Sequence, residues 1–265
     1  MLASIARKIF KPILGRLRLQ RFFELLHSFS IIGLNASGPV SPRASGEIQA
    51  IKLVIKNFSH EPELIIFDVG ANQGDYSALV SELASGQARI YAFEPAQKMF
   101  NDLKMRLGKR PGISLYNFGF SSENREAILY FNSLETGLSS LYVRQLDDYD
   151  ISSYHQEKIS LRTIDSFCAE QRLKRIHLLK LDIEGHELEA LAGASSLLAA
   201  GNIDCIQFEF GGADIDSRVF FRDFYNLLNR QYVIYRIVQD GLYEIKKYKE
   251  AHEIFYMTNY LAVKR

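Results

Sequence analysis

The sequence of 265 residues has no tryptophan, only two cysteines and no long apolar run. Without tryptophan, phenylalanine and tyrosine are the only large rings that could stack on a ligand. Cys168 and Cys205 are too few for a disulfide framework and lack metal-site spacing, so we expect two buried thiols in a reducing compartment. Charged residues interrupt the apolar ones near the start too often for a secretory signal or a membrane span. These absences favour a cytoplasmic protein.

Charge is nearly balanced in total but unevenly distributed. The net charge is +1, whereas the first 21 residues contain six basic side chains and no acidic one. The remainder therefore has 26 basic and 31 acidic side chains, a net charge of −5. Because enzymes that act on nucleic acid usually present a basic groove, an acidic body argues against a nucleic-acid substrate.

Residues 1–46 are predicted to form a basic helical extension followed by a linker. Residues 2–34 have a helical pattern that Pro12 is expected to break or kink, and residues 36–46 are rich in turn formers. Three interpretations of the helix are open. It packs against the domain or a partner, it lies peripherally on an anionic membrane surface, or it is a loose arm.

From residue 47 to residue 265, helical patterns alternate with short apolar strands. Nearly continuous apolar strands of this kind are typical of a mostly parallel sheet covered by helices on both faces. We therefore expect one α/β domain of the Rossmann-like type. Strands are predicted at 64–67, 89–93, 113–117, 176–181, 203–208, 232–238, 242–245 and 255–263, and helices at 47–58, 75–85, 96–107, 187–199 and 217–229.

The segment of about 118–160 departs from this alternation. It is polar and β-like, with strand patterns at 127–131 and 141–143 and a loop at 132–140. An insertion here would overhang the carboxyl ends of the central strands, where open α/β sheets bind their ligands. The segment is therefore a candidate substrate lid.

The first chemical motif is a loop between a buried strand and a helix, running from Asp68 through Gly70 to Gly74. Glycines let the backbone turn tightly and approach a ligand without a Cβ clash. Glu94 follows 20 residues after Gly74, at the end of the second strand. A carboxylate at that place can accept hydrogen bonds from both hydroxyls of a ribose.

The same loop discriminates between nucleotide cofactors. It lacks the middle glycine of the dinucleotide fingerprint, and Asp68 would repel a phosphate. S-adenosylmethionine contains no phosphate and has a sulfonium and an ammonium group, which suit an acidic loop. The loop therefore favours S-adenosylmethionine over a nicotinamide dinucleotide.

The second motif is concentrated at the end of the strand at 176–181. Lys180, Asp182, Glu184 and Glu187 lie within eight residues, and burying so many ionisable groups is costly without a task or mutual pairing. A structural ion pair of Lys180 with one of the two nearest carboxylates is the alternative to a catalytic role.

Several motifs of the chain, in order, resemble those of the FkbM family of methyltransferases. They cover about residues 60–212: I-I-F-D-V-G-A-N-Q-G (65–74), F-E-P (93–95), T-G-x-S-S (136–140), T-I-D-S-F (163–167), L-L-K-L-D-I-E-G-H-E (178–187), L-x-G-A (191–194) and F-E-F (208–210). The resemblance implies a seven-stranded sheet whose last strand is antiparallel. It also implies methyl transfer, mostly to oxygen, with sugars, polysaccharides or natural-product hydroxyls as acceptors.

The resemblance further implies which residues contact the cofactor. It assigns Asp68, Gly70, Asn72 and Glu94 to S-adenosylmethionine, and it places Asn117 near the adenine. Oligomeric state and acceptor identity do not follow from the sequence, because substrate contacts in this architecture come from variable loops.

For the chemistry, our hypothesis is that Asp182 faces the methyl group and acts as the base or as a metal ligand. Glu184, His186 and Glu209 are candidates to complete the catalytic site, although a histidine at a helix start is often a surface residue. Magnesium is an open alternative, with Asp182 and Glu209 as oxygen ligands, because the donors suit a hard cation while the spacing is not specific for a metal.

The inserted segment supplies candidate acceptor contacts. Thr136, Ser139 and Ser140 could hydrogen-bond a polyol, or they could form an ordinary polar turn. Two further function classes stay open: a catalytically silent cofactor-binding scaffold, and a nicotinamide oxidoreductase.

Overall fold

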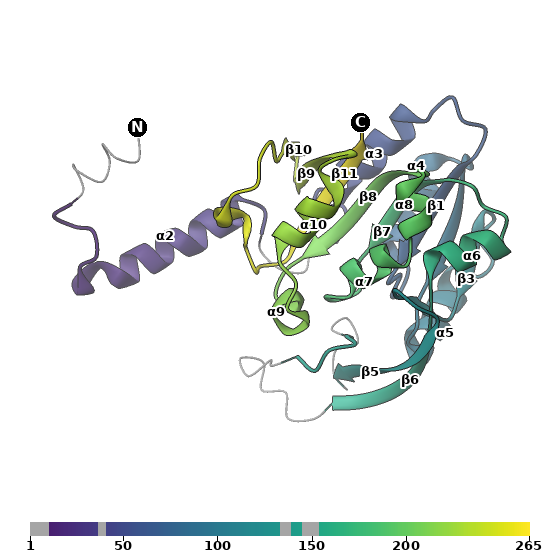
Figure 1. Cartoon of the computed structure of the whole chain (residues 1–265), viewed down its shortest axis with the longest axis horizontal. Helices are drawn as coiled ribbons and strands as arrows, with labels where there is room; N and C mark the ends of the chain where they lie inside the picture. The colour runs from purple at the N-terminus through teal and green to yellow at the C-terminus, as the bar shows by residue number, and fades with distance from the viewer. Residues whose placement is uncertain (1–10, 37–40, 133–138, 145–153) are drawn as a thin grey trace.

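The computed structural model describes residues 11–36, 41–132, 139–144 and 154–265. Its largest element is a sheet of eight strands in the order β10-β9-β11-β8-β7-β1-β2-β3 (Figure 1). The strands are β1 Leu64–Val69, β2 Ala88–Phe93, β3 Ile113–Tyr116, β7 Ile176–Leu181, β8 Ile203–Phe210, β9 Tyr232–Val238, β10 Gly241–Glu244 and β11 Thr258–Lys264.

The sheet is parallel from β3 to β8 and antiparallel beyond it. Strands β3, β2, β1, β7 and β8 pair in parallel, and β11 runs antiparallel to both β8 and β9. This confirms the Rossmann-like sheet with an antiparallel last strand. The expected count of seven is exceeded by β10, which pairs with β9 through a two-residue turn and extends the edge of the sheet.

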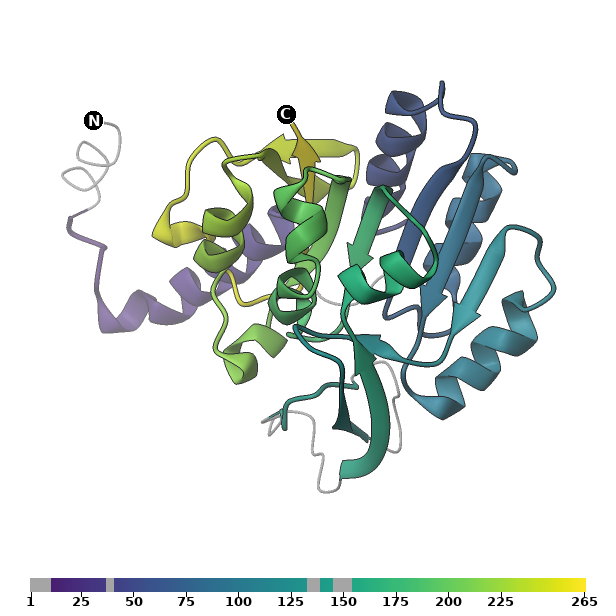
Figure 2. The ribbon, with the colours of Figure 1, turned by 45° about the vertical axis from the view of Figure 1, so that its right-hand side comes forward.

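Helices cover both faces of the sheet, as Figure 2 shows. They are α3 Glu47–Asn57, α4 Asp75–Ala84, α5 Gln97–Leu107, α6 Ile164–Glu170, α7 Glu187–Ala192, α8 Ser195–Ala199, α9 Ala213–Ser217 and α10 Phe221–Leu228. Successive side chains of a strand point to opposite faces. In β1, Phe67 therefore joins the aromatic core under α6, whereas Ile66 packs with α3 and α4. Cys168 and Cys205 are buried thiols, as predicted.

Two predicted helices are interrupted for identifiable reasons. The helix expected at 187–199 divides into α7 and α8 at Gly193, where a Cβ would lie 2.0 Å from the carbonyl oxygen of Ser121. The helix expected at 217–229 begins at Phe221 instead, because the backbone of Arg218 has a φ of +60° and ends α9. The close approach of Gly193 to another backbone segment and the backbone conformation of Arg218 set these helix boundaries. The periodicity of apolar residues does not predict either feature.

The inserted segment forms a second sheet of three strands below the first one (Figure 1). Its strands are β4 Gly119–Phe120, β5 Arg125–Asn132 and β6 Tyr154–Arg162. Leu129, Ile159 and Leu161 pack against Met99 at the start of α5. The strand pattern at 141–143 was wrong, since the described residues there only adjoin an isolated bridge between Ser140 and Tyr130.

The N-terminal segment projects from the body (Figures 1 and 2). The described part begins with turns around Pro12 and a short 3₁₀ helix, η1 Leu17–Leu19, and the α-helix α2 covers only Gln20–Gly33. Its last turn packs through Ile31 against Ala36 and Ile254. No helix in the described part of the chain is both long and apolar enough to cross a membrane.

Candidate active site

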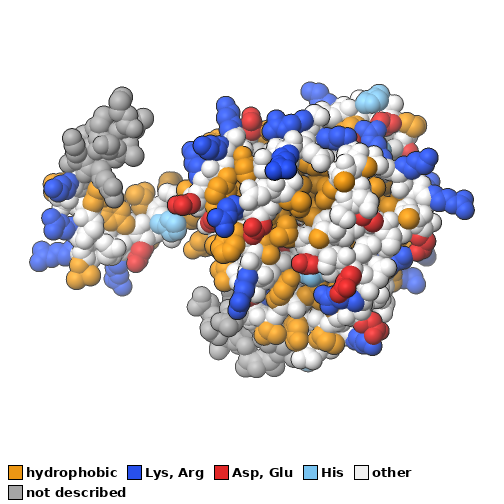
Figure 3. Space-filling model, in the orientation of Figure 1, with side chains coloured by type: hydrophobic (Ala, Val, Ile, Leu, Met, Phe, Trp, Pro, Cys, Tyr) orange, Lys and Arg blue, Asp and Glu red, His pale blue; other side chains and the backbone are white. Residues whose placement is uncertain are grey.

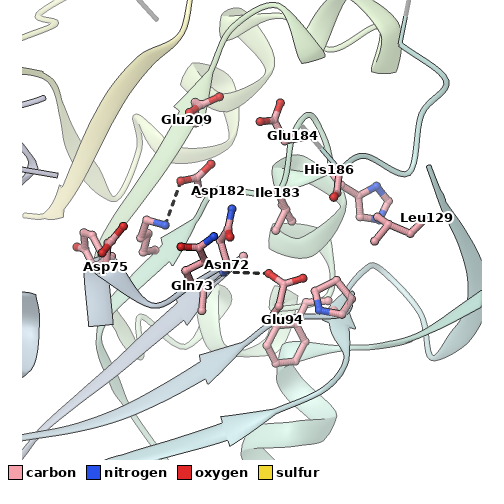
Figure 4. A pocket seen from close by; sticks show the side chains of 18 of the residues that line it. Asn72, Gln73, Asp75, Glu94, Leu129, Asp182, Ile183, Glu184, His186 and Glu209 are labelled. Atoms are coloured by element: carbon pink, nitrogen blue, oxygen red, sulfur yellow. Dashed lines mark hydrogen bonds and ion pairs between the residues drawn. The ribbon is translucent and has the colours of Figure 1, made fainter. Parts of the chain in front are cut away.

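A cavity of about 770 Å³ opens at the carboxyl ends of β1, β2, β7 and β8. Parallel strands direct the residues that follow them to one edge of the sheet, so segments far apart in sequence meet there. Figure 4 shows their side chains converging on the cavity. The lining side chains discussed below are Glu47, Asn72, Asp75, Tyr76, Glu94, Ser139, Lys180, Asp182, Glu184, His186 and Glu209.

Glu94 is held by backbone donors on both of its carboxylate oxygens. Oε2 accepts a hydrogen bond from the N–H of Asn72 at 2.9 Å, and Oε1 accepts one from the N–H of Ala96 at 2.8 Å. Burial raises the pKa of Glu94 to about 7, and the two backbone donors oppose this rise. Each oxygen retains a lone pair that can face the cavity.

Asn117 stands behind this turn and does not line the cavity. Its Nδ2 donates to the carbonyl oxygens of Glu94 and Pro95 at 2.9 and 3.0 Å. The asparagine therefore fixes the backbone that carries Glu94, and the structure gives no direct ligand contact for it.

The two glycines of the β1–α4 loop serve backbone packing. Gly70 has a φ of +79°, and a Cβ there would lie 1.9 Å from the carbonyl oxygen of Asp182. Gly74 has a φ of +84°, and its Cβ would collide with Leu103 and Leu107 of α5. Gly70 borders the cavity and Gly74 does not, so the loop needs glycine for the approach of protein to protein.

Lys180 pairs with two aspartates at the floor of the cavity. Its Nζ lies 3.3 Å from Oδ1 of Asp68 and 3.1 Å from Oδ2 of Asp182. Asp68 is fully buried and also accepts a hydrogen bond from Ser77 at 2.6 Å. Burial alone would lower the pKa of Lys180, but the surrounding carboxylates outweigh it and raise that pKa. Asp68 thus neutralises a lysine and does not line the cavity.

A hydrogen-bonded chain connects this lysine to a residue far along the sequence. Lys180 Nζ lies 4.9 Å from the centre of the Tyr76 ring, and the Tyr76 hydroxyl donates to Gln207 of β8 at 2.8 Å. Nε2 of Gln207 donates to Glu47 at 2.7 Å, and Ser45 donates to the other oxygen of Glu47. Sequence analysis missed Tyr76, Gln207 and Glu47, although a glutamine inside an apolar strand was a visible signal.

Glu209 and Glu184 line the side of the cavity opposite Glu94 (Figure 4). Glu184 has a φ of +53° and accepts a hydrogen bond from Arg144 at 2.8 Å. Burial raises its pKa to about 7, with Asp182 adding to the effect. Glu209 is 8% exposed, and burial followed by Asp182 raises its pKa well above the ordinary value. Arg144 was another residue that sequence analysis missed.

His186 lies between two hydroxyl groups. Its Nδ1 is 3.0 Å from the Tyr142 hydroxyl, and its Nε2 is 3.0 Å from the Ser121 hydroxyl. Burial lowers the pKa of His186 to about 4, so the ring is neutral at pH 7. It is not the surface residue that often starts a helix, and both of its nitrogens are already engaged.

The candidate acceptor contacts lie at different places. Ser139 lines the cavity, whereas the hydroxyl of Ser140 is buried and donates to the carbonyl oxygen of Glu184 at 2.8 Å. Ser140 therefore attaches the inserted segment to the end of β7. Thr136 lies outside the described residues.

A family model described as the methyltransferase FkbM domain matches residues 68–234 of this sequence. The match covers more than half of the chain and includes the residues that follow β1, β2, β7 and β8. The chain belongs to the FkbM methyltransferase family.

Three curated relatives of this FkbM domain are similar at low identity. Methyltransferase 1 of Beauveria bassiana is 29% identical over 48% of the chain and 57% of the relative. Hexuronic acid methyltransferase AglP of Haloferax volcanii is 24% identical over 63% of the chain and 64% of the relative. The 2-O-methyltransferase NoeI of Sinorhizobium fredii is 23% identical over 54% of the chain and 63% of the relative. The chain thus spans about three fifths of the length of each of these relatives.

No metal site of three or more histidine, cysteine or acidic side chains occurs among the described residues of the FkbM domain. Asp182 follows β7, Glu209 lies near the end of the neighbouring strand β8, and both line the same cavity, so they would provide two carboxylates for a cation.

Replacing Lys180 with methionine is expected to lower the free energy of unfolding by about 3–5 kcal/mol, because Asp68 would remain buried without its cation. Denaturant unfolding measures the change. The double variant Lys180→Met, Asp68→Asn should recover part of the loss, since it removes the uncompensated charge. A single variant as stable as the wild type would contradict the buried ion pair.

Proposed function

We propose that this chain is an S-adenosylmethionine-dependent O-methyltransferase whose acceptor is a hydroxyl of a sugar, a polysaccharide or a natural product. The observation that carries the proposal is the convergence of Glu94, Asp182 and Glu209 on one cavity at adjoining strand ends. The names of the Haloferax and Sinorhizobium relatives, a hexuronic acid methyltransferase and a 2-O-methyltransferase, support it.

Glu94 is suited to hold the ribose of the cofactor. Backbone donors fix its carboxylate and use one acceptor position on each oxygen. The two positions that remain match the two adjacent hydroxyls of a ribose. The cavity volume of about 770 Å³ is in the range of cofactor and ligand sites.

The acidic middle of the cavity is suited to the cationic part of the cofactor. Asp182 has a side chain that is 36% exposed, and Lys180 engages its Oδ2. A carboxylate held in this way attracts a sulfonium, whereas it would repel the diphosphate of a nicotinamide dinucleotide. The proposal therefore ranks methyl transfer above the oxidoreductase alternative.

In the reaction, the acceptor oxygen attacks the methyl carbon in line with the carbon–sulfur bond. The new carbon–oxygen bond forms as the carbon–sulfur bond breaks, and S-adenosylhomocysteine leaves. The hydroxyl proton passes to a carboxylate, for which we propose Asp182, with Glu184 and Glu209 accepting hydrogen bonds from the acceptor. His186 is less suited to this task, because its pKa is about 4 and hydroxyl groups occupy both nitrogens.

Titration calorimetry is expected to detect binding of S-adenosylhomocysteine and no binding of NADH. Because ribose hydroxyls donate to the ionised form of Glu94, whose pKa is about 7, the affinity should fall about tenfold from pH 8 to pH 6. Glu94→Gln should bind more weakly at pH 8 and lose most of this pH dependence. Equal affinity of the variant and the wild type at both pH values would reject the role of Glu94.

Replacing Asp182 with asparagine should abolish most turnover, by about 100-fold or more, because the proton acceptor is lost. S-adenosylhomocysteine release is measured with a hydroxylated acceptor that the wild type methylates. Affinity for S-adenosylhomocysteine should persist, since this product carries no sulfonium and the asparagine oxygen can still accept a hydrogen bond from Lys180. Undiminished turnover would reject Asp182 as the base, and cofactor binding without turnover in the wild type would favour the scaffold alternative.

We also propose that the N-terminal segment binds an anionic membrane surface. Of α2, only the last turn packs on the body, while Phe22, Leu25, Leu26, Phe29 and Ile32 are each about half exposed or more. At 100° per residue, these five side chains fall within about 120° of the helix circumference. The apolar stripe points away from the side of Ile31, which contacts the body.

The charges beside this stripe favour lipid as its occupant. Lys11, Arg16, Arg18 and Arg21 precede or begin α2, and residues 1–21 contain no acidic side chain. Figure 3 shows basic and apolar side chains together on this projecting segment, clear of the body. A basic flank beside an apolar helical face is the combination that anionic bilayers bind.

The double variant Leu25→Asp, Phe29→Asp is expected to lose about tenfold or more of its binding to vesicles that contain phosphatidylglycerol. Co-sedimentation measures the binding, and phosphatidylcholine vesicles should bind the wild type weakly. Met105→Asp is the matched control, because Met105 is 80% exposed on α5. Wild-type dimers that the double variant abolishes, without vesicle binding, would instead assign the stripe to a second copy of the chain.

A further inference from the structure

The ionisable side chains of the cavity wall are almost all acidic. Six carboxylate side chains line the cavity: Glu47, Asp75, Glu94, Asp182, Glu184 and Glu209. Among the described residues, Lys180 is the only cationic side chain that lines it, and this lysine is bound to Asp68 and Asp182. A negatively charged ligand would therefore find no unpaired cation on the described part of the wall.

The carboxylates divide between two sides of the cavity. Figure 4 shows Glu94 on one side and Glu184 and Glu209 on the other, with Asp182 between them. If Glu94 holds the ribose, the side of Glu184 and Glu209 is left for the acceptor. This division rests on the proposed function.

On that side of the cavity, Glu209 has no partner among the described residues. It is 8% exposed, it lines the cavity, and it makes no hydrogen bond or ion pair with the residues that the structure describes. Its neighbours Phe208 and Phe210 are fully buried in the aromatic core on the opposite side of β8. The oxygens of Glu209 face the cavity instead of the protein, so a ligand that displaces the water there has to satisfy this carboxyl group.

Among the described residues, few basic side chains that could pair with an acidic acceptor lie near the side of the cavity that Glu184 and Glu209 line. Arg144 lies 2.8 Å from Glu184 and 3.8 Å from Asp216, so two carboxylates already share its charge.

We infer that the acceptor side of the cavity selects against acceptors with negative charge, and that Glu209 is the residue that discriminates between acceptors by their charge. The acceptor class is a hydroxylated ring that is uncharged or carries an ammonium group, and a phosphorylated sugar or a hexuronate is excluded. This chain would therefore differ in acceptor from the Haloferax relative, whose name gives a hexuronic acid. The unpartnered carboxyl of Glu209 binds a hydroxyl or ammonium group next to the reacting oxygen. Ranked by affinity, aminated rings come first, neutral rings next and acidic rings last.

The test compares rings that differ in one charged group. Methyl glycosides of glucose, galactose and mannose are titrated by saturation-transfer NMR, each beside its uronic acid and its 2-amino analogue, with the protein saturated by S-adenosylhomocysteine at pH 7. At least one neutral ring should bind. Its uronic acid should bind at least about tenfold more weakly than the neutral ring, and its 2-amino analogue should bind at least as tightly as the neutral ring.

Glu209→Gln should reduce the preference for the amine over the neutral ring by about fivefold, because a carboxylate can pair with an ammonium and an amide cannot. Glu244→Gln is the matched control, since Glu244 is exposed on β10, and its preferences should equal those of the wild type. Acids that bind as tightly as neutral rings, no ring binding at all, or an unchanged preference in Glu209→Gln would each overturn the inference. Retained S-adenosylhomocysteine binding in any of these cases would leave the methyltransferase proposal standing.

Discussion

The buried ammonium of Lys180 is the interaction on which the rest of the site depends. It lies between Asp68 of β1 and Asp182 after β7, and it therefore joins two parallel strands at the edge where the cavity opens. Without that cation, the Asp68 carboxylate would be fully buried with no opposite charge beside it, which is strongly unfavourable in the protein interior. The same lysine contacts the ring of Tyr76, whose hydrogen bonds extend to β8 and α3. One charge thus fixes the floor of the cavity and the orientation of Asp182.

The carboxylates outnumber the cations around this floor, and the imbalance has a chemical consequence. Burial raises the pKa values of Glu94, Glu184 and Glu209, so the wall takes up protons near neutral pH when no ligand is present. A ligand with positive charge or with hydroxyl donors relieves this cost. A sulfonium donor and a polyol acceptor are ligands of this kind, which unites the two halves of the proposed reaction in one electrostatic environment.

Much of the fold was predictable from the sequence, because strand burial on both faces leaves a direct record in apolar runs. Strands β7 and β9 begin and end at the predicted residues, and the clustering of Glu94, Asp182 and Glu209 follows from the geometry of parallel strands. The roles within the site were less accessible. Asp68 and Asn117 turned out to stand behind the cavity wall, and Gly74 makes room for leucines of α5. The sequence did not predict roles for Glu47 and Arg144, since their partners Gln207 and Glu184 lie 160 and 40 residues away along the chain.

A crystal structure of the full chain with S-adenosylhomocysteine tests the central claim most directly, namely that acidic side chains at adjoining strand ends form one site for a cationic methyl donor. We expect both ribose hydroxyls within hydrogen-bonding distance of Glu94 and the sulfur next to Asp182, between Glu94 and the side of the cavity that Glu184 and Glu209 line. A nucleoside bound elsewhere, or a sulfur directed away from Asp182, would contradict the account.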